Sequence, residues 1–243
     1  MKRRQLLTSA LSVSAASALG ACSSVGSVGG LGGILSQSTG ASGVLSIAEI
    51  GAGLKEALNV GAGRAVSLLA VEDGFFANPD VKIPLPSTMQ SVRETLDKVG
   101  FGSPFNDLEL QMNRAAEQAA PQARDLFVGA ITSLTLEDVQ GIYTGGNDAA
   151  TTFLRSKTAD PLAEKMTPII DGSLANVGAV NTFSNIMGRY NQLPFVPKVE
   201  TNLTGHVVNA GLDGIFLMLG REEAAIRQDP LKRSTDLLRR VFT

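Results

Sequence analysis

Apolar residues recur at intervals of three and four along most of the chain from residue 46 onwards. The first such stretch runs from Ser46 to about Asp73, and its apolar stripe consists of Ile47, Ile50, Leu54, Leu58, Ala62, Ala65 and Leu69. This spacing places the apolar side chains on one face and predicts an amphipathic helix. Ser46 and Glu49 at its start form a capping box, in which both side chains bond backbone groups of the first turn.

Capping residues and prolines indicate further helix starts. They lie at Ser87, Ser103-Pro104, Pro121, Thr135, Asn147, Asp160-Pro161 and Asp229-Pro230. In the last two, an acidic N-cap residue precedes a proline at the first helical position. The pattern predicts an all-α fold, a single globular multi-helix domain over residues 46–243 with about nine to eleven helices.

Two short segments alternate as strands do. The first contains Val81, Ile83 and Leu85, and Pro84 and Pro86 keep it out of any central ladder. Phe195, Pro197 and Val199 repeat the pattern late in the chain. We therefore expect, at most, a minor two-stranded ribbon between them.

The first predicted helix contains Gly51, Gly53, Gly61 and Gly63. Each glycine costs a helix up to about 1 kcal/mol, so something should compensate for them. Close approach of another helix backbone is the simpler explanation, and room for a ligand is the alternative.

The N-terminus has the three parts of a signal peptide: Lys2, Arg3 and Arg4, an uncharged run from Leu6 to Leu19, and small residues before Cys22. Leu19-Gly20-Ala21-Cys22 is a lipobox, and Cys22 is the only cysteine in the chain. We interpret residues 1–21 as a lipoprotein signal peptide and Cys22 as the lipidated residue. The arginine pair is compatible with both general secretory and twin-arginine export.

Residues 22–45 form the predicted tether between this lipid and the helical domain. Residues 23–43 contain 13 Gly or Ser in 21 positions and no charged residue, a composition typical of flexible linkers. In a bacterium with two membranes, Ser23 after the lipidated cysteine favours the periplasmic face of the outer membrane. The expected partner is thus a membrane, reached through Cys22.

Charge and composition exclude several classes of function. Loss of residues 1–21 changes the balance from 21 basic against 23 acidic residues to 18 against 23, or a formal net charge of −5. An acidic chain of this kind is not expected to bind nucleic acid. His206 is the only histidine, and the chain has no Walker A, dinucleotide-binding or G-x-S-x-G motif. We therefore expect no metal site and no cofactor.

One polar group lies inside an otherwise apolar stretch, Leu203 to Leu219. His206, Asn209 and Asp213 share a helical face there, and Asp213 needs a partner or its pKa rises. An interior ion pair is the simplest interpretation, with Arg114, Arg155 or Arg189 as the partner. A polar anchor in a ligand pocket and a general acid or base are the alternatives.

A second polar group combines Asn113, Arg114 and Glu117, of which the last two can pair along a helix. Together with His206, Asn209 and Asp213, these residues form a candidate pocket or buried polar network. Hydrogen bonding at a helix junction is the simplest role for Asn113, Arg114 and Glu117. We expect Glu222, Glu223 and Arg227 on a solvated face. Residues 231–242 combine an apolar stripe with basic residues, which suits docking on the core or resting on anionic lipid.

Several segments resemble the domain-of-unknown-function family 4197 of bacterial envelope proteins. The resemblance covers residues from about 44 to the end, and it is carried by 82–86, 112–117, 147–155, 212–216, 221–227 and 237–242. It implies a secreted or lipid-anchored helical domain and supplies no catalytic residues.

Two hypotheses remain. The first is a non-enzymatic lipid-anchored envelope protein that binds a hydrophobic small molecule or a protein partner. Its ligand version predicts a cavity lined by the first helix and by Leu203 to Leu219. The second is a carboxylate-dependent hydrolase or lyase of the periplasm, in which Asp213 acts with another acidic group in an open cleft.

Overall fold

The structure is a computed structural model, and it describes residues 46–176, 178–229 and 239. Its described part is helical and contains no strand, as the sequence predicts for fold class. The helices are α1 (Ile47–Leu69), α2 (Ser87–Asp97), α3 (Ser103–Ala119), the short 3-10 helix η1 (Ala120–Gln122), α4 (Ala123–Thr132), α5 (Leu136–Thr144), α6 (Ala149–Asn176), α7 (Ala179–Tyr190) and α8 (Leu203–Gln228). The signal peptide, Cys22 and the tether lie outside the described residues.

Two of the predicted helix starts, at Ser46 and Thr135, are capped by side chains, whereas α2 and α3 begin at Ser87 and Ser103 without a side-chain cap. The Ser46 hydroxyl accepts the N–H of Glu49 at 3.2 Å, and the Glu49 carboxylate accepts the N–H of Ser46 at 3.0 Å. Thr135 and Asp138 form the same reciprocal pair at the start of α5. These bonds satisfy backbone donors that have no partner within the helix.

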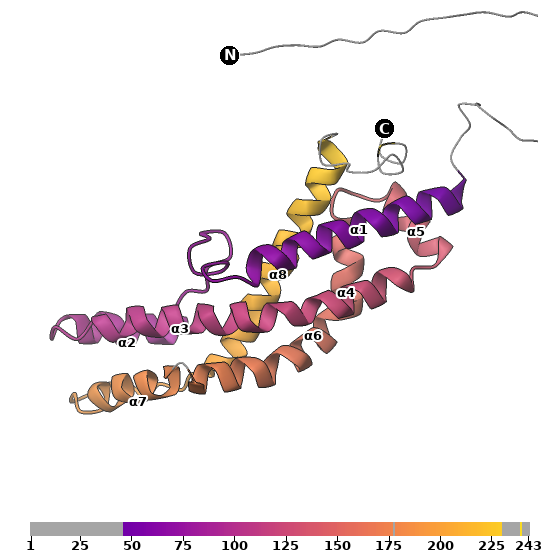
Figure 1. Cartoon of the computed structure of the whole chain (residues 1–243). Helices are drawn as coiled ribbons and strands as arrows, with labels where there is room; N and C mark the ends of the chain where they lie inside the picture. Colours follow the sequence, from indigo (N-terminus) through magenta and orange to yellow (C-terminus); the bar gives the residue numbers. More distant parts are fainter. Residues whose placement is uncertain (1–45, 177, 230–238, 240–243) are drawn as a thin grey trace, which may run out of the picture. The chain divides into compact units, whose positions relative to one another are not determined.

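The central helix is α8, which runs across α1, α3 and α6 and packs against all three (Figure 1). By length and composition α8 is apolar enough to cross a membrane, and 44% of its most apolar window is buried within the protein. Phe216 of α8 meets Phe127 of α4 edge to face, with ring centroids 5.8 Å apart. Because its apolar residues fill the interior between other helices, α8 serves as the core of the helical unit.

Close helix approach does not explain Gly51, Gly61 or Gly63 of α1. A Cβ atom at Gly51 or Gly61 would meet its nearest neighbours at an ordinary 3.5 Å, and one at Gly63 would meet nothing within 4 Å. Gly214 of α8 is a tight position where a loop meets the core helix. A Cβ there would lie 2.8 Å from the ring of Phe75, so this glycine lets the loop after α1 pack directly on α8.

The predicted number of helices is too high for the described residues. Asp160-Pro161 does not start a helix, because α6 continues through both Pro161 and Pro168 to Asn176. An interior proline costs about 3 kcal/mol. Buried apolar residues before, between and after the prolines pack as one face against α3 and α8, and this packing offsets the cost. These residues are Leu154, Leu162, Met166 and Ile170.

The predicted ribbon is also wrong, since neither segment forms a strand among the described residues. Asn113 of α3 takes the place of a neighbouring strand for the first segment. Its side-chain oxygen accepts the N–H of Ile83 at 2.8 Å, and its amide donates to the Ile83 carbonyl at 2.9 Å. Ile83 and Asn113 are both fully buried, so this exchange satisfies backbone groups that water cannot reach.

Replacing Asn113 by Ala should destabilise the protein by about 3 kcal/mol, because it leaves both backbone groups of Ile83 buried without a partner. The free energy of unfolding from urea titration measures the loss. Asn106→Ala is the matched control, since Asn106 lies exposed on the same helix and bonds Arg93 at the surface. An Asn113→Ala protein as stable as this control would contradict the assigned role.

Candidate functional site

The α1–α2 loop, residues 70–86, is held to α3 by a buried carboxylate. One oxygen of Glu117 accepts the backbone N–H groups of Phe75 and Phe76 at 3.1 and 3.2 Å. The other accepts a bond from Arg114 at 2.7 Å, and Arg114 also bonds Asp73 at 2.7 Å. Glu117 is 5% exposed, so its charge is compensated by donors rather than by water.

Two ion pairs on this loop shift pKa values. The hydrogen bond to Glu117 raises the pKa of the Arg114 guanidinium, and the bond to Asp73 acts in the same direction. The hydrogen bond from Arg221 of α8 holds the pKa of the exposed Asp80 carboxyl below its ordinary value. A lowered pKa means that this pair stabilises the fold above the ordinary pKa of Asp80 and loses that contribution as the pH falls through the folded value.

A second buried carboxylate, Glu223 of α8, holds the start of α6. It accepts the backbone N–H groups of Ala150 and Thr151 at 3.1 and 2.8 Å and the Thr151 hydroxyl at 2.8 Å. Arg227, one turn later, donates to Glu223 and to the Ile142 carbonyl of α5. The carboxylate thus caps α6 from another helix, which suits the positive end of the helix dipole.

The solvated face predicted for Glu222, Glu223 and Arg227 is therefore wrong. Glu223 is 6% exposed, the Arg227 side chain is 13% exposed, and the 15% exposed side chain of Glu222 faces Arg64 at 3.8 Å. The Glu223 and Arg227 spacing of four residues was the available signal, because it fits an ion pair along a helix. The sequence gives no indication that Ala150 and Thr151 are the partners of Glu223, because they lie more than 70 residues away from it in the chain.

The polar residues of the apolar α8 stretch face the surface. Asp213 pairs with Arg155 of α6, one of the three partners considered, but both side chains are more than half exposed. The Arg155 guanidinium also lies 5.2 Å from the centre of the Phe216 ring. Asn209 is exposed, and a ring nitrogen of His206 lies 2.8 Å from the Pro84 carbonyl.

The six candidate residues thus form no common pocket. Asn113, Arg114, Glu117 and His206 all act on the α1–α2 loop, while Asp213 pairs with α6. Within the described residues, no three His, Cys, Asp or Glu side chains are grouped so that they could hold a metal ion. The buried carboxylates Glu117 and Glu223 already accept bonds on both oxygens, which leaves neither poised for proton transfer.

The hollow between α1 and α8 lies where the ligand hypothesis places a cavity. Its volume is about 20 Å³, and it is lined mainly by Leu54, Ala57, Leu58, Gly61, Leu219 and Ile226. Larger hollows of about 380 to 530 Å³ are open to the surface, and two of them, about 380 and 410 Å³, lie around the α1–α2 loop. The interior space is close to that of a single water molecule.

Comparison with known families agrees with the resemblance seen in the sequence. The model of a family described as "Protein of unknown function (DUF4197)" matches residues 44–243. The chain belongs to the DUF4197 family. No curated protein and no solved structure matches it.

Four of the segments that resemble DUF4197 contact each other in two pairs in the described part of the structure, whereas 237–242 lies almost entirely outside it. The segment 112–117 holds 82–86 through Asn113, and 221–227 holds 147–155 through Glu223. Gly214, in 212–216, receives the Phe75 ring. These motif residues therefore act in assembling the helical unit.

Glu223→Gln should destabilise the protein by about 3 kcal/mol, because it removes a buried charge that compensates Arg227 and the α6 start. Urea denaturation at neutral pH measures the change. Glu164→Gln, on the exposed face of α6, should alter the unfolding free energy by less than about 0.5 kcal/mol. Equal stability of the two variants would refute the capping role of Glu223.

Asp213→Asn should cost less than about 1 kcal/mol, since its ion pair with Arg155 is exposed and screened by water. Thermal denaturation of the variant and of Arg155→Gln measures this cost. A loss comparable to that of Glu223→Gln would show that Asp213 contributes more than a surface pair does.

Proposed function

We propose that this DUF4197 protein is a lipid-anchored envelope protein that binds a partner protein through the surface of its helical unit. The observation that carries the proposal is a filled interior combined with a fully exposed aromatic residue, Phe195. The lipobox at Cys22 supports the anchor. Binding of a hydrophobic small molecule receives less support, because the hollow between α1 and α8 is too small to hold one.

Sites for small organic ligands have volumes of about 300–1,000 Å³ and enclose most of the ligand surface. The hollow between α1 and α8 is about 20 Å³, so it has no room for a hydrophobic molecule. The apolar residues of α1 instead pack against α4, α5 and α8. Among the described residues, space for recognition is found on the outside of the unit.

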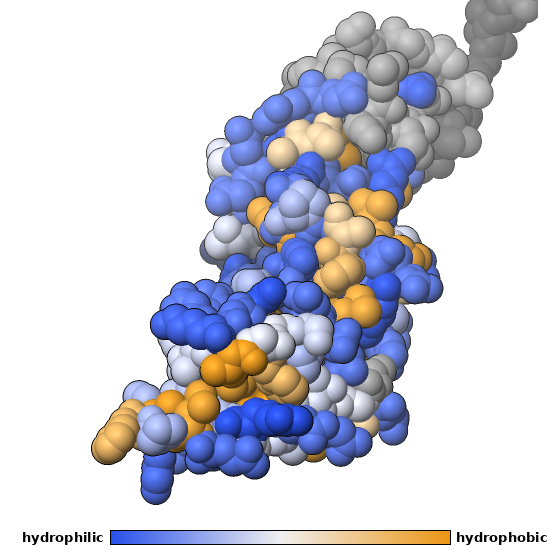
Figure 2. Space-filling model, turned by 90° about the vertical axis from the view of Figure 1, so that its left-hand side faces the viewer, coloured by the Kyte–Doolittle hydropathy of each residue, from blue (hydrophilic) through white to orange (hydrophobic). Residues whose placement is uncertain are grey.

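Apolar side chains gather on one part of that outside. Figure 2 looks onto the end of the unit where α2 and α7 lie and shows apolar side chains among hydrophilic ones. Among the exposed large apolar side chains of the described residues, Phe195 has the highest exposed fraction, 104%. An apolar patch with a polar rim is typical of surfaces that bind other proteins or membranes.

The enzymatic alternative receives less support from the carboxylates. It requires Asp213 and a second acidic group in one cleft, but Asp213 is exposed and paired with Arg155. Glu117 and Glu223 are saturated with donors in separate places. We therefore favour binding over turnover.

Cys22→Ser should abolish incorporation of radiolabelled palmitate and move the protein from the membrane fraction to the soluble one, because the thiol is the proposed site of lipid attachment. Ser23→Ala is the control and should keep both properties. Globomycin should shift the electrophoretic mobility of the unaltered protein by retaining its signal peptide. If globomycin leaves the mobility of the unaltered protein unchanged and the Cys22→Ser variant still incorporates palmitate, the proposed lipid anchor is refuted.

The binding role is tested by native mass spectrometry of the full chain extracted from membranes in mild detergent. We expect the acylated chain in complexes with protein and without a bound small molecule. A stoichiometric hydrophobic adduct besides the anchor would favour the ligand hypothesis instead.

A further inference from the structure

The end of α8 carries an apolar contact that lies outside the main core. Ile226 in the last turn of α8 and Ala57 of α1 are each 3% exposed, and together they form an apolar cluster of their own. Farther back along α8, Met218 shares a surface hollow with Leu68 near the end of α1. From Met218 to Ile226, α8 therefore runs back toward the start of α1, and it ends at Gln228 near the middle of α1.

An apolar face of α1 continues past the end of α8. It consists of Gly53, Ala57 and Val60, which recur at intervals of four and three and therefore lie on one side of the helix. We call it the Gly53 face. Gly53 and Ala57 are buried, and Val60 is partly buried. Since α8 meets this face at Ala57 through Ile226, the part toward the start of α1 lies in the path of the chain that follows α8.

Residues 230–243 follow α8, and the backbone at Asp229 directs them out of that helix. Asp229 has extended dihedral angles, φ −108° and ψ 108°, which end α8 and suit a residue that caps a new helix. Pro230 suits the first position of such a helix. Arg239, the residue of this segment that the structure describes, is helical. We therefore expect a helix over residues 231–242.

This expected helix has an apolar stripe of the right length for the Gly53 face. Leu231, Leu238 and Phe242 are seven and four residues apart, so they share one side of a helix. Residues 231–242 extend about 18 Å as a helix, and residues 47–57 of α1 extend about 15 Å. The stripe therefore matches the first half of α1 in length.

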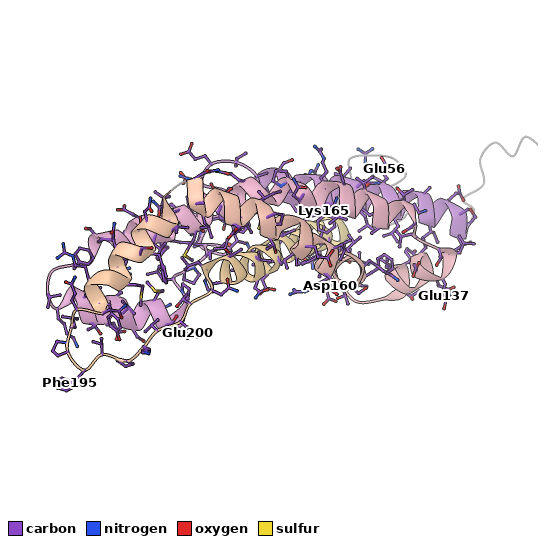
Figure 3. All side chains as sticks on the ribbon, turned by 90° about the horizontal axis from the view of Figure 1, so that it is seen from below. Glu56, Glu137, Asp160, Lys165, Phe195 and Glu200 are labelled. Carbon is purple, nitrogen blue, oxygen red and sulfur yellow. The ribbon has the colours of Figure 1, made fainter. Side chains whose placement is uncertain are left out.

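Opposite charges border the two surfaces. Glu49 and Glu56 of α1, seven residues apart, lie along one edge of the Gly53 face. Figure 3 shows Glu56 in the half of the unit that also carries Glu137 of α5, away from Phe195. The segment after α8 has basic residues on both sides of its stripe, in pairs with the same spacing: Lys232 with Arg239, and Arg233 with Arg240. One basic pair can therefore follow the acidic edge of α1, as charged residues do at the borders of paired helices.

Anionic lipid suits this segment less well than α1 does. A helix lying on a membrane would contribute nothing to the burial of Gly53 and Ala57. Docking within the chain costs little entropy, because Asp229 already holds the segment within three residues of Ile226. The DUF4197 match also extends through the segment to residue 243, so the segment belongs to the helical domain.

We infer that residues 230–242 form a helix that docks on the Gly53 face of α1, with Leu231, Leu238 and Phe242 toward that face. The docked helix adds apolar cover to Ala57 and Ile226 and holds its basic residues beside the acidic edge of α1. Contact with the membrane is then left to the proposed lipid on Cys22. The inference goes beyond the proposed function and does not depend on it.

Hydrogen exchange of the full chain, read by mass spectrometry, distinguishes docking from lipid binding. The chain is compared in neutral maltoside micelles and in vesicles that contain phosphatidylglycerol. Docking predicts that the amides of residues 230–242 are protected equally in both, because their cover comes from α1. Protection of residues 230–242 that appears in the anionic vesicles and not in the micelles would overturn the inference.

Leu238→Asp places a charge in the docked stripe, so it should release the helix. We expect exchange in residues 230–242 and in residues 47–60 to accelerate about tenfold or more, because the two segments protect each other. Leu217→Asp is the matched control, since Leu217 is 43% exposed on α8, and it should leave both segments unchanged. Unchanged exchange of residues 47–60 in Leu238→Asp would overturn the inference.

Exchange of α3 shows whether Leu238→Asp acts locally, because α3 should keep its protection. If α3 loses protection as well, Glu56→Lys decides, since it changes the acidic edge of α1 without a charge in the apolar stripe. This reversal should accelerate exchange of residues 230–242 about twofold, as expected for a partly exposed ion pair. Glu164→Lys, on the exposed face of α6, is its control and should have no effect there. Equal exchange in the two reversals would overturn the inference.

Discussion

The helical unit depends on buried side-chain acceptors that pair with backbone N–H groups far away in the chain. Asn113 and Glu117 bind the α1–α2 loop, and Glu223 binds the start of α6. Loops and first turns carry donors that no regular hydrogen-bond pattern satisfies, and burying them without partners is costly. Each of these acceptors bonds N–H groups that would otherwise be buried without a partner. Helices α3 and α8 can therefore pack against backbone that is not in a regular hydrogen-bond pattern.

This arrangement gives a physical account of the DUF4197 motifs. A motif rich in Asn, Arg and Glu suggests a catalytic site when it is considered alone. Here the polar residues of one motif form hydrogen bonds with the backbone of another motif. Asn113 bonds the backbone of Ile83, and Glu223 accepts the backbone N–H groups of Ala150 and Thr151. The spacing of residues within these motifs therefore serves the fold.

The two proline-containing segments show how the same local sequence acquires different roles. Both contain apolar residues at alternate positions of the sequence, yet Val81, Ile83 and Leu85 are buried, whereas residues 196–201 include no buried residue and make no backbone hydrogen bond to another described residue. The difference arises from the neighbours that packing provides, since Asn113 and His206 lie over the first segment only.

The sequence by itself determined the all-α class, the capping box at Ser46 and most helix starts, including the one at Thr135, because these depend on residues within one or two turns of each other. It did not determine that α6 passes through two prolines, because this depends on the packing of α6 against α3 and α8. The sequence also did not show that Glu223 is buried and Asp213 exposed. Helical spacing shows which residues share a face, but it does not show whether another helix covers that face. Tertiary structure decided these points, because only packing brings the distant backbone donors and apolar surfaces to the residues concerned.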